Sequence, residues 1–107
     1  MAKAIPWARL TSLSKNNPDN EITSDIFTIG RKVSNDLQIK NPKLSARHCR
    51  ITREKERDNT YSYYVEDVST NGTFHNGSKI GKENRMVLAD GDEIVLLSKQ
   101  QISGIGM

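Results

Sequence analysis

Apolar and polar residues alternate in short runs along the first half of the chain, and turn-forming residues separate these runs. The alternation predicts strands over Trp7 to Leu13, Asp25 to Gly30 and Leu37 to Ile39. No segment long enough for a stable helix repeats apolar residues three and four positions apart. Because many short strands with regular turn signals are typical of a β-sandwich, the sequence predicts an all-β fold, an antiparallel β-sandwich.

The clearest alternation lies over His48 to Arg53. Successive side chains of a strand point to opposite faces of a sheet. Cys49 and Ile51 are therefore expected to face the core, and Arg50 and Thr52 are expected to face water.

Two further strands are predicted downstream. Tyr61 to Asp67 is the most β-prone segment because it is rich in aromatic residues, and a charged loop over Glu54 to Thr60 precedes it. Glu93 to Leu97 has the composition of a buried strand. The glycine-rich tail over 98–107 is expected to hold either a last strand or a truncated end.

Clusters of Asn, Gly, Asp and Pro mark the turns between these strands. Asn16 to Asn20 is one such cluster, and Pro42 removes an amide donor from a second loop. Three pairs favour tight turns because Asn, Asp and Gly tolerate positive φ. These pairs are Asn71-Gly72, Asn76-Gly77 and Asp90-Gly91.

The composition limits what this chain does. Its 107 residues leave room for one domain over 1–107, with 16 basic residues mixed among 13 acidic ones and a net charge of +3. A single cysteine, Cys49, excludes an internal disulfide and a cysteine-based zinc site, and it is expected as a small core residue. We expect no cofactor. No apolar run approaches the roughly 20 residues that span a bilayer, and no secretory signal opens the chain, so an intracellular protein is expected.

Four short motifs carry polar residues suited to a binding site. In a sandwich, loops gather at the ends of the sheets, so segments far apart in sequence are expected to meet at one rim. The motifs are Gly30-Arg31, Ser45-Ala46-Arg47-His48, Asp67-Val68-Ser69-Thr70-Asn71-Gly72-Thr73 and Asn76-Gly77.

These residue types suit a phosphate ester on a peptide. A phosphate monoester carries about 1.5 to 2 negative charges and three acceptor oxygens. Arg31 supplies a guanidinium fork, and Ser45 and Thr70 supply hydroxyl donors. Asn71 offers an amide that donates and accepts, which suits the backbone of an extended peptide.

The ordered set of four motifs resembles the signature of the forkhead-associated domain, over roughly residues 28–97. The resemblance implies a sandwich of about eleven strands whose loops bind phosphothreonine peptides. The opening Pro6-Trp7-Ala8-Arg9-Leu10 and the strand Tyr64-Val65-Glu66-Asp67 are most similar to the checkpoint effector serine/threonine kinases.

The resemblance also implies roles for single residues. Arg31 and Ser45 contact the phosphate, Thr70 supports the loop beside it, and Asn71 bonds the ligand backbone. Lys43 faces the third residue after the phosphothreonine in this fold, which predicts an acidic preference there.

The remaining motif residues are implied to hold the loops in shape. His48 ties the Ser45 loop to its neighbours, and Gly30, Gly72 and Asn76 maintain loop geometry.

One position departs from the family pattern. The residue after the serine is often polar or basic in the family, whereas here it is Ala46, which offers only its backbone amide to the phosphate. Compensation by Arg47 is an open alternative, although strand alternation would point its side chain to the opposite side from Ala46. We therefore expect weaker phosphate binding than in relatives with a polar residue at this position.

These observations predict a non-catalytic phosphothreonine-binding module, the regulatory domain of a nuclear checkpoint protein kinase. Its partner is expected to be a phosphorylated protein, with self-association as one case. An alternative is the same domain in a mitotic-checkpoint ubiquitin ligase. A downstream kinase domain or RING motif in the full-length protein distinguishes the two.

Two other classes of function remain as alternatives. Tyr61, Tyr63 and Tyr64 could stack bases in a basic nucleic-acid-binding domain, whose affinity would fall steeply with salt. Ser45 and His48, with Asp67, have the residue types of a hydrolase triad. The triad is disfavoured because no Gly-x-Ser-x-Gly elbow is present.

Overall fold

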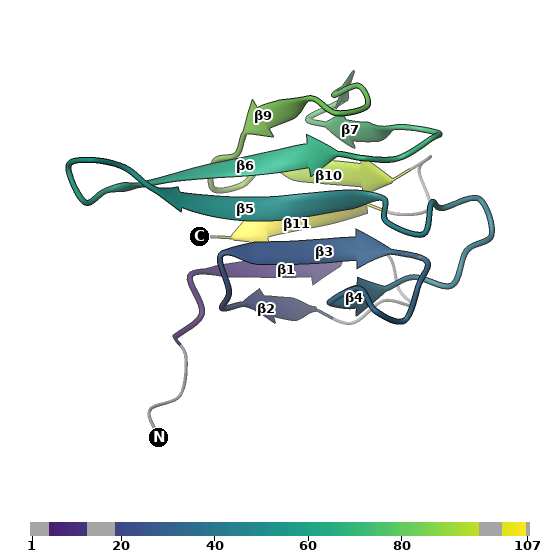
Figure 1. The fold of residues 1–107 in the computed structure, drawn as a ribbon, viewed down its shortest axis with the longest axis horizontal. Helices are drawn as coiled ribbons and strands as arrows, with labels where there is room; N and C mark the ends of the chain where they lie inside the picture. The colour runs from purple at the N-terminus through teal and green to yellow at the C-terminus, as the bar shows by residue number, and fades with distance from the viewer. Residues whose placement is uncertain (1–4, 13–18, 97–101, 107) are drawn as a thin grey trace.

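Two β-sheets pack face to face in the computed structural model (Figure 1). The structure describes residues 5–12, 19–96 and 102–106, and every regular element in these ranges is a β-strand. No helix in the described ranges is long and apolar enough to cross a membrane. The prediction of an all-β sandwich of about eleven strands is confirmed.

The first sheet has six strands in the order β2-β1-β11-β10-β7-β8. Its last strand in sequence, β11, lies between β1 and β10 and pairs with both. The tail beyond residue 98 thus contributes a central strand. The bounds are β1 Ala8–Ser12, β2 Asn20–Ile22, β7 Thr73–His75, β8 Ser78–Lys79, β10 Glu93–Leu96 and β11 Ile102–Gly106.

The second sheet has five strands in the order β4-β3-β5-β6-β9. Its longest pairing joins β5 and β6, in register from Cys49 opposite Asp67 to Lys55 opposite Tyr61. The bounds are β3 Ile26–Gly30, β4 Leu37–Gln38, β5 Cys49–Lys55, β6 Tyr61–Asp67 and β9 Arg85–Val87.

The sheets are antiparallel, as predicted, except at one pair, since β3 and β4 run parallel. The loop after β3 turns the chain back before β4 begins. Asp36 Oδ2 accepts the Thr28 amide at 2.8 Å, and the Asp36 amide donates to Thr28 Oγ1 at 3.0 Å. These bonds place the start of β4 beside the middle of β3, so the two strands run in the same direction.

Several strand boundaries differ from the predictions. Strand β5 extends to Lys55 into the predicted loop over Glu54 to Thr60, because Glu54 and Lys55 still pair with β6. Asn20, predicted in a turn, belongs to β2, a strand too short to show alternation. Strands β7, β8 and β9 have only two or three residues each, and the sequence pattern does not predict them. Leu13, residues 16–18 of the predicted turn and Leu97 lie outside the described residues.

The core lies between the sheets and is formed by the inward side chains of both. Cys49 and Ile51 are buried there, as predicted. Arg50 and Thr52 point to the other face, as predicted, but both are half-buried, and Arg50 pairs with Glu66 across β5 and β6. The buried apolar residues are Ala8, Leu10, Ile22, Phe27, Ile29, Ile39, Leu44, Cys49, Ile51, Val65, Ile80, Leu88, Ile94, Leu96 and Ile105.

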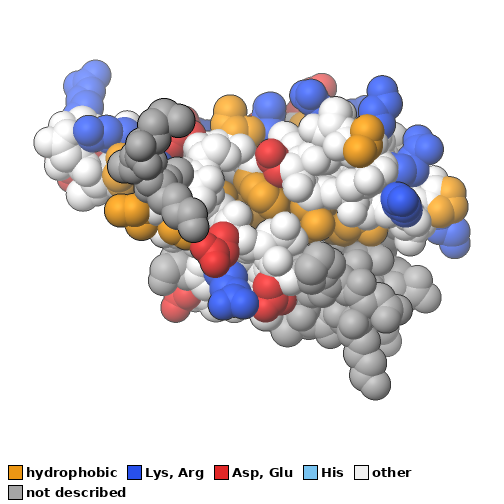
Figure 2. Space-filling model, turned by 90° about the horizontal axis from the view of Figure 1, so that it is seen from below, with side chains coloured by type: hydrophobic (Ala, Val, Ile, Leu, Met, Phe, Trp, Pro, Cys, Tyr) orange, Lys and Arg blue, Asp and Glu red, His pale blue; other side chains and the backbone are white. Residues whose placement is uncertain are grey.

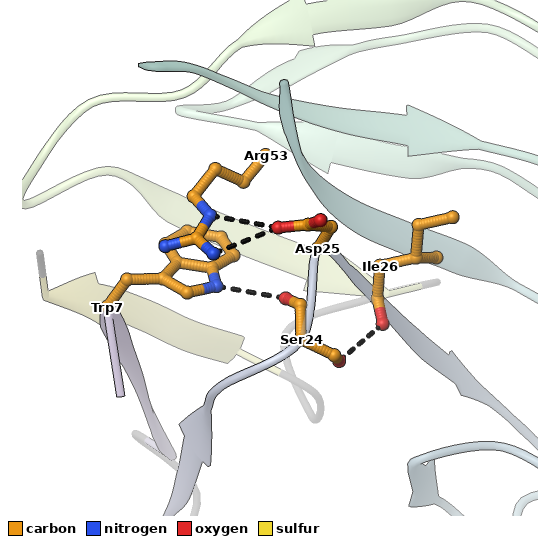
Figure 3. Close-up of polar contacts among 5 residues, drawn as sticks. All are labelled: Trp7, Ser24, Asp25, Ile26 and Arg53. Atoms are coloured by element: carbon orange, nitrogen blue, oxygen red, sulfur yellow. Dashed lines mark hydrogen bonds and ion pairs between the residues drawn. The ribbon is translucent and has the colours of Figure 1, made fainter. Parts of the chain in front are cut away.

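Trp7 fastens the start of β1 to the second sheet (Figure 3). Its ring stacks on Tyr63 with centroids 5.2 Å apart, and its Nε1–H donates to the Ser24 carbonyl at 2.9 Å. The Arg53 guanidinium lies over the same indole at 5.3 Å and bonds Asp25 Oδ1 at 2.9 Å. Trp7 therefore joins segments that are far apart in the sequence.

The tyrosines of β6 do not form a free stacking platform. Tyr63 packs against Trp7, and Arg53 and Arg85 lie over Tyr61 and Tyr64 at 4.5 and 3.8 Å. Because each ring already has a partner, these tyrosines do not favour base stacking.

Trp7→Ala should lower the free energy of unfolding by about 2 kcal/mol, less than the roughly 3–5 kcal/mol of a fully buried tryptophan. Trp7→Phe keeps an aromatic ring and loses the Nε1–H bond, so a loss of about 1 kcal/mol is expected. Urea unfolding measures both, with Ile5→Ala as the exposed control. Equal losses in the alanine and phenylalanine variants would contradict the stacking argument.

Candidate functional site

Three loops lie at the same end of the sandwich, opposite the β5–β6 hairpin (Figure 1). They follow β3, precede β5 and follow β6, and they cover residues 31–36, 40–48 and 68–72. Hydrogen bonds between backbone and side chains join these loops directly. We call this end of the molecule the rim.

Arg31 is fixed at the rim by two bonds to the neighbouring loop. Its amide donates to the Ser45 carbonyl at 3.0 Å, and its side-chain Nε donates to the Leu44 carbonyl at 3.1 Å. Leu44 is buried, so this anchor belongs to the core. The terminal Nη groups of the exposed Arg31 bond no residue that the structure describes, which leaves them for an anion in solution.

Gly30 has no side chain, which lets the end of β3 pack closely against Ala46 of the second loop. A Cβ on Gly30 would lie 2.3 Å from the Ala46 carbonyl oxygen and 2.9 Å from Asn35 Nδ2. Both groups belong to the packed base of the rim, because Asn35 is buried and donates to the carbonyls of Lys32 and Ala46.

Ser45 connects the second loop with the third. Its Oγ accepts the backbone N–H of Thr70 at 2.9 Å. This bond fixes the oxygen through a lone pair, and the hydroxyl proton is left to donate to a ligand. The Thr70 side chain is exposed beside it.

Asn71 lies between Thr70 and a glycine, and its side chain reaches across to the second loop. Its Nδ2 donates to the Lys43 carbonyl at 2.9 Å. One N–H and the carbonyl oxygen of the amide bond no described residue. This arrangement presents a fixed donor and acceptor pair at the rim, and the exposed Lys43 is beside it.

The buried His48 holds the second and third loops together. The Ser45 amide donates to His48 Nδ1 at 3.3 Å, so Nε2 carries the proton and donates to the Gly72 carbonyl at 2.7 Å. The ring is fully buried and neutral in this tautomer. A proton on Nδ1 would face the Ser45 N–H, so the charged form would break this link.

Asp67 organises the third loop from below. Its buried carboxylate accepts the amides and hydroxyls of both Ser69 and Thr73. Burial alone would raise the pKa of Asp67, but these hydrogen bonds stabilise the charged form and hold its pKa below the usual range. Ser69 Oγ also accepts the Gly72 amide at 2.8 Å, so the loop turns over a satisfied polar cluster.

Asn76 lies away from the other motif residues. It occupies the turn between β7 and β8 with φ of 49°, followed by Gly77 at 86°. Its side-chain Oδ1 accepts the Glu93 backbone N–H at 2.8 Å, and its own backbone N–H donates to the Glu93 carbonyl at 2.9 Å. The hydrogen bonds of Asn76 thus fasten the β7–β8 hairpin to β10. The prediction of a tight Asn76-Gly77 turn is confirmed.

Ala46 and Arg47 lie in a bend and not in a strand, so the alternation argument applied to Arg47 is wrong. Strand β5 begins only at Cys49, after His48 has bonded both loops. The Ala46 carbonyl accepts the Lys32 amide at 3.3 Å. The Ala46 amide bonds no described residue and remains a donor at the rim.

The sequence did not reveal the supports beneath the rim. Leu44 contributes its backbone carbonyl, which accepts the Arg31 Nε–H, and Asn35 contributes its buried side-chain amide. No local sequence pattern distinguishes such contacts. Ser69 stands within the third motif, which is a weak signal for its role. Its importance depends on the distance to Asp67, which only the folded chain defines.

The geometry does not assemble a hydrolase triad. His48 Nδ1 bonds the backbone of Ser45 and not its hydroxyl, and Asp67 bonds Ser69 and Thr73. No group of three or more potential metal ligands lies within the ranges that the structure describes.

Comparison with known proteins identifies the family. The model of the FHA domain matches residues 27–97. The chain belongs to the FHA domain family. Among its relatives, the probable serine/threonine-protein kinase fhkE of Dictyostelium discoideum is 36% identical over 100 residues, which cover 92% of this chain and 14% of the kinase.

A second type of relative carries the domain as well. The E3 ubiquitin-protein ligase CHFR of Xenopus tropicalis is 36% identical over 102 residues, which cover 89% of this chain and 16% of the ligase. This FHA chain therefore spans only a small part of the curated relatives that it matches.

Solved FHA domains have the same fold. The N-terminal FHA domain of S. cerevisiae Rad53p, in complex with a phosphothreonine peptide, superposes with a TM-score of 0.80 at 25% identity, covering 96% of this chain and 94% of that one. The MEK1 FHA domain superposes with a TM-score of 0.83 at 24% identity, covering 94% and 88%.

Gly30→Ala should lower the free energy of unfolding by about 2–3 kcal/mol, since its Cβ would overlap the Ala46 carbonyl. Gly104→Ala is the matched control, because a Cβ there meets nothing within 4 Å. Its stability should stay within about 0.5 kcal/mol of the wild type in urea unfolding. Similar stabilities for the two variants would refute the close-approach argument.

The stability of the domain should fall as the pH falls below about 6.5. Burial lowers the pKa of His48, although the Gly72 carbonyl and the charge of Asp67 oppose this effect. The unfolded chain then binds more protons between the folded and unfolded pKa values, so the free energy of unfolding decreases as the pH falls through that window.

Urea unfolding between about pH 7 and 5.5 tests this, above the range where ordinary carboxylates titrate. His75→Gln removes the other histidine and should retain the decline. A wild-type stability that stays constant or rises toward pH 5.5 would contradict the role given to His48.

Proposed function

We propose that this FHA domain binds phosphothreonine peptides at the rim, without catalysis. The phosphopeptide-binding residues are Arg31, Ser45, the Ala46 backbone, Thr70 and Asn71, with Lys43 as a specificity residue. The observation that carries the proposal is the Ser45 hydroxyl, held by the Thr70 amide beside the anchored Arg31.

The phosphate site is organised before a ligand arrives. The Nε and amide of Arg31 are already bonded, so the guanidinium loses little further freedom when its Nη groups bind an anion. Ser45 adds a hydroxyl donor, and the Ala46 amide adds a backbone donor. Hydrogen bonds to a charged group contribute about 1.5 to 3 kcal/mol each, so two or three of them account for much of a micromolar affinity.

The peptide backbone is expected to lie along Asn71. Its free N–H and carbonyl oxygen suit the carbonyl and amide of an extended chain. Lys43, whose carbonyl holds Asn71, supports an acidic preference in the residues after the phosphothreonine. The methyl side chain of Ala46 adds no polar contact, which favours moderate affinity.

The full-length protein is proposed to be a nuclear checkpoint serine/threonine kinase with this module as its regulatory part. The kinase relatives support this assignment, and the ligase relatives support the alternative of a mitotic-checkpoint ubiquitin ligase. A phosphorylated partner protein, or a phosphorylated copy of the same protein, is the proposed ligand. A downstream kinase domain in the full-length sequence would favour the first assignment, and a RING motif the second.

Arg31→Ala should weaken binding of a phosphothreonine peptide by about 10- to 100-fold, because it removes a charge-assisted contact worth about 1.5 to 3 kcal/mol. Calorimetric titration with matched phosphothreonine, phosphoserine and threonine peptides measures this. The wild type should prefer phosphothreonine and bind the unphosphorylated peptide negligibly.

Arg9→Ala is the control, since Arg9 pairs with Asp19 away from the rim. This variant should bind as the wild type does. Undiminished phosphothreonine binding by Arg31→Ala would reject the assigned phosphate site, and binding that ignores phosphorylation would reject the proposed function.

A further inference from the structure

Four arginines of the described residues pair with carboxylates away from the rim: Arg9 with Asp19, Arg50 with Glu66, Arg53 with Asp25 and Arg85 with Glu54. At the rim, Arg31, Lys43 and Lys79 form no ion pair with any described residue. Figure 2 shows Lys and Arg side chains gathered at the end where the rim loops project in Figure 1.

The basic residues of the rim outnumber the acidic ones, since the loops over 31–36, 40–48 and 68–72 contain five lysines and arginines and one carboxylate, Asp36. Asp36 is turned back onto β3, where it binds the amide and hydroxyl of Thr28. Asp67 is buried beneath the third loop. Glu83 lies in the exposed turn before β9, with a positive φ of 69°, and forms no ion pair with a described residue. The rim therefore keeps an excess of positive charge, beyond what one phosphate of about 1.5 to 2 charges requires.

Lys79 is a further cation at this end of the molecule that lies outside the sequence motifs. It lies on β8 opposite Phe74, and its neighbour Ile80 is buried while Lys79 itself is exposed. A Cβ on Gly72 would lie 3.0 Å from Lys79 Cε and 3.6 Å from its Nζ. The end of the lysine side chain therefore lies across the third loop at Gly72.

This position is next to the residue that we assign to the peptide backbone. Gly72 directly follows Asn71, and His48 and Ser69 hold Gly72 in place. Asn71 thus bonds the Lys43 carbonyl through its side chain, and the Lys79 side chain lies against Gly72, the residue that follows Asn71 in the chain. A peptide bound by Asn71 would therefore have the Lys79 ammonium nearby.

We propose that Lys79 forms a second anionic subsite, which binds a carboxylate or a second phosphate on the same peptide. The inference rests on the proposed function and extends it to a doubly anionic ligand. The source of the second charge, an acidic residue or a further phosphorylated residue, is distinguished by the peptides used.

The test is a titration series with phosphothreonine peptides in an otherwise alanine-rich sequence. Aspartate, phosphoserine or lysine is placed at each flanking position in turn. For the wild type, aspartate should strengthen binding about threefold at a position that depends on Lys79, as for an exposed ion pair. Phosphoserine there should strengthen binding more, because it carries more charge.

Variants assign the effect to its residue. Lys79→Ala should abolish the gain at that position and leave binding of the all-alanine peptide within twofold of the wild type. Lys43→Ala should leave the Lys79-dependent gain unchanged. It should abolish only a gain at a different peptide position, the one that depends on Lys43. Lys82→Ala, which removes an exposed lysine from the next turn, should leave the Lys79-dependent gain unchanged.

Charge reversal provides the sharpest outcome. Lys79→Glu should prefer lysine to aspartate at the same peptide position, whereas Lys82→Glu should not. If no position shows a gain that Lys79→Ala removes, or if the preference does not reverse, the second subsite is wrong while phosphothreonine binding stands. If the wild type binds no phosphothreonine peptide, both proposals are wrong.

Discussion

The rim depends on one buried histidine. His48 accepts the Ser45 amide on one ring nitrogen and donates to the Gly72 carbonyl with the other. These two bonds join loops that lie 24 residues apart in the chain. Because the ring is fully buried, an unpaired nitrogen would carry the full cost of desolvation, and this cost favours the neutral tautomer that satisfies both loops.

Polar contacts within the protein hold the loops together, and among the described residues Asn35 Oδ1 is the one buried side-chain nitrogen or oxygen without a hydrogen-bond partner. Asp67 takes the amides and hydroxyls of Ser69 and Thr73, and the Asn35 amide joins the first loop to the second. Such networks are stabilising only when nearly complete, since each orphaned buried group costs about 1–3 kcal/mol. The ligand-facing groups are therefore positioned by contacts that the ligand never makes. This preorganisation reduces the entropy lost on binding.

The charged residues on the sheets and those at the rim have different partners. Along the sheets, arginines are matched with carboxylates or lie over aromatic rings, as Arg53 does over Trp7. At the rim, Arg31 is held by carbonyl groups, which fix its position without neutralising it. A cation held by neutral groups keeps its field for an external anion. The same principle applies to Lys79, whose side chain lies against Gly72 and forms no ion pair with a described carboxylate.

The sequence by itself determined the all-β class, the inward face of β5, and the motifs at Arg31, Ser45 and Asn71, because alternation and turn chemistry are local properties. It did not determine the parallel pairing of β4, the central place of β11 or the position of Lys79 over Gly72. Those features depend on which distant segments come together, and short strands carry too little pattern to specify a partner. Tertiary structure decided them, since packing and buried hydrogen bonds select one arrangement from many that the local sequence allows.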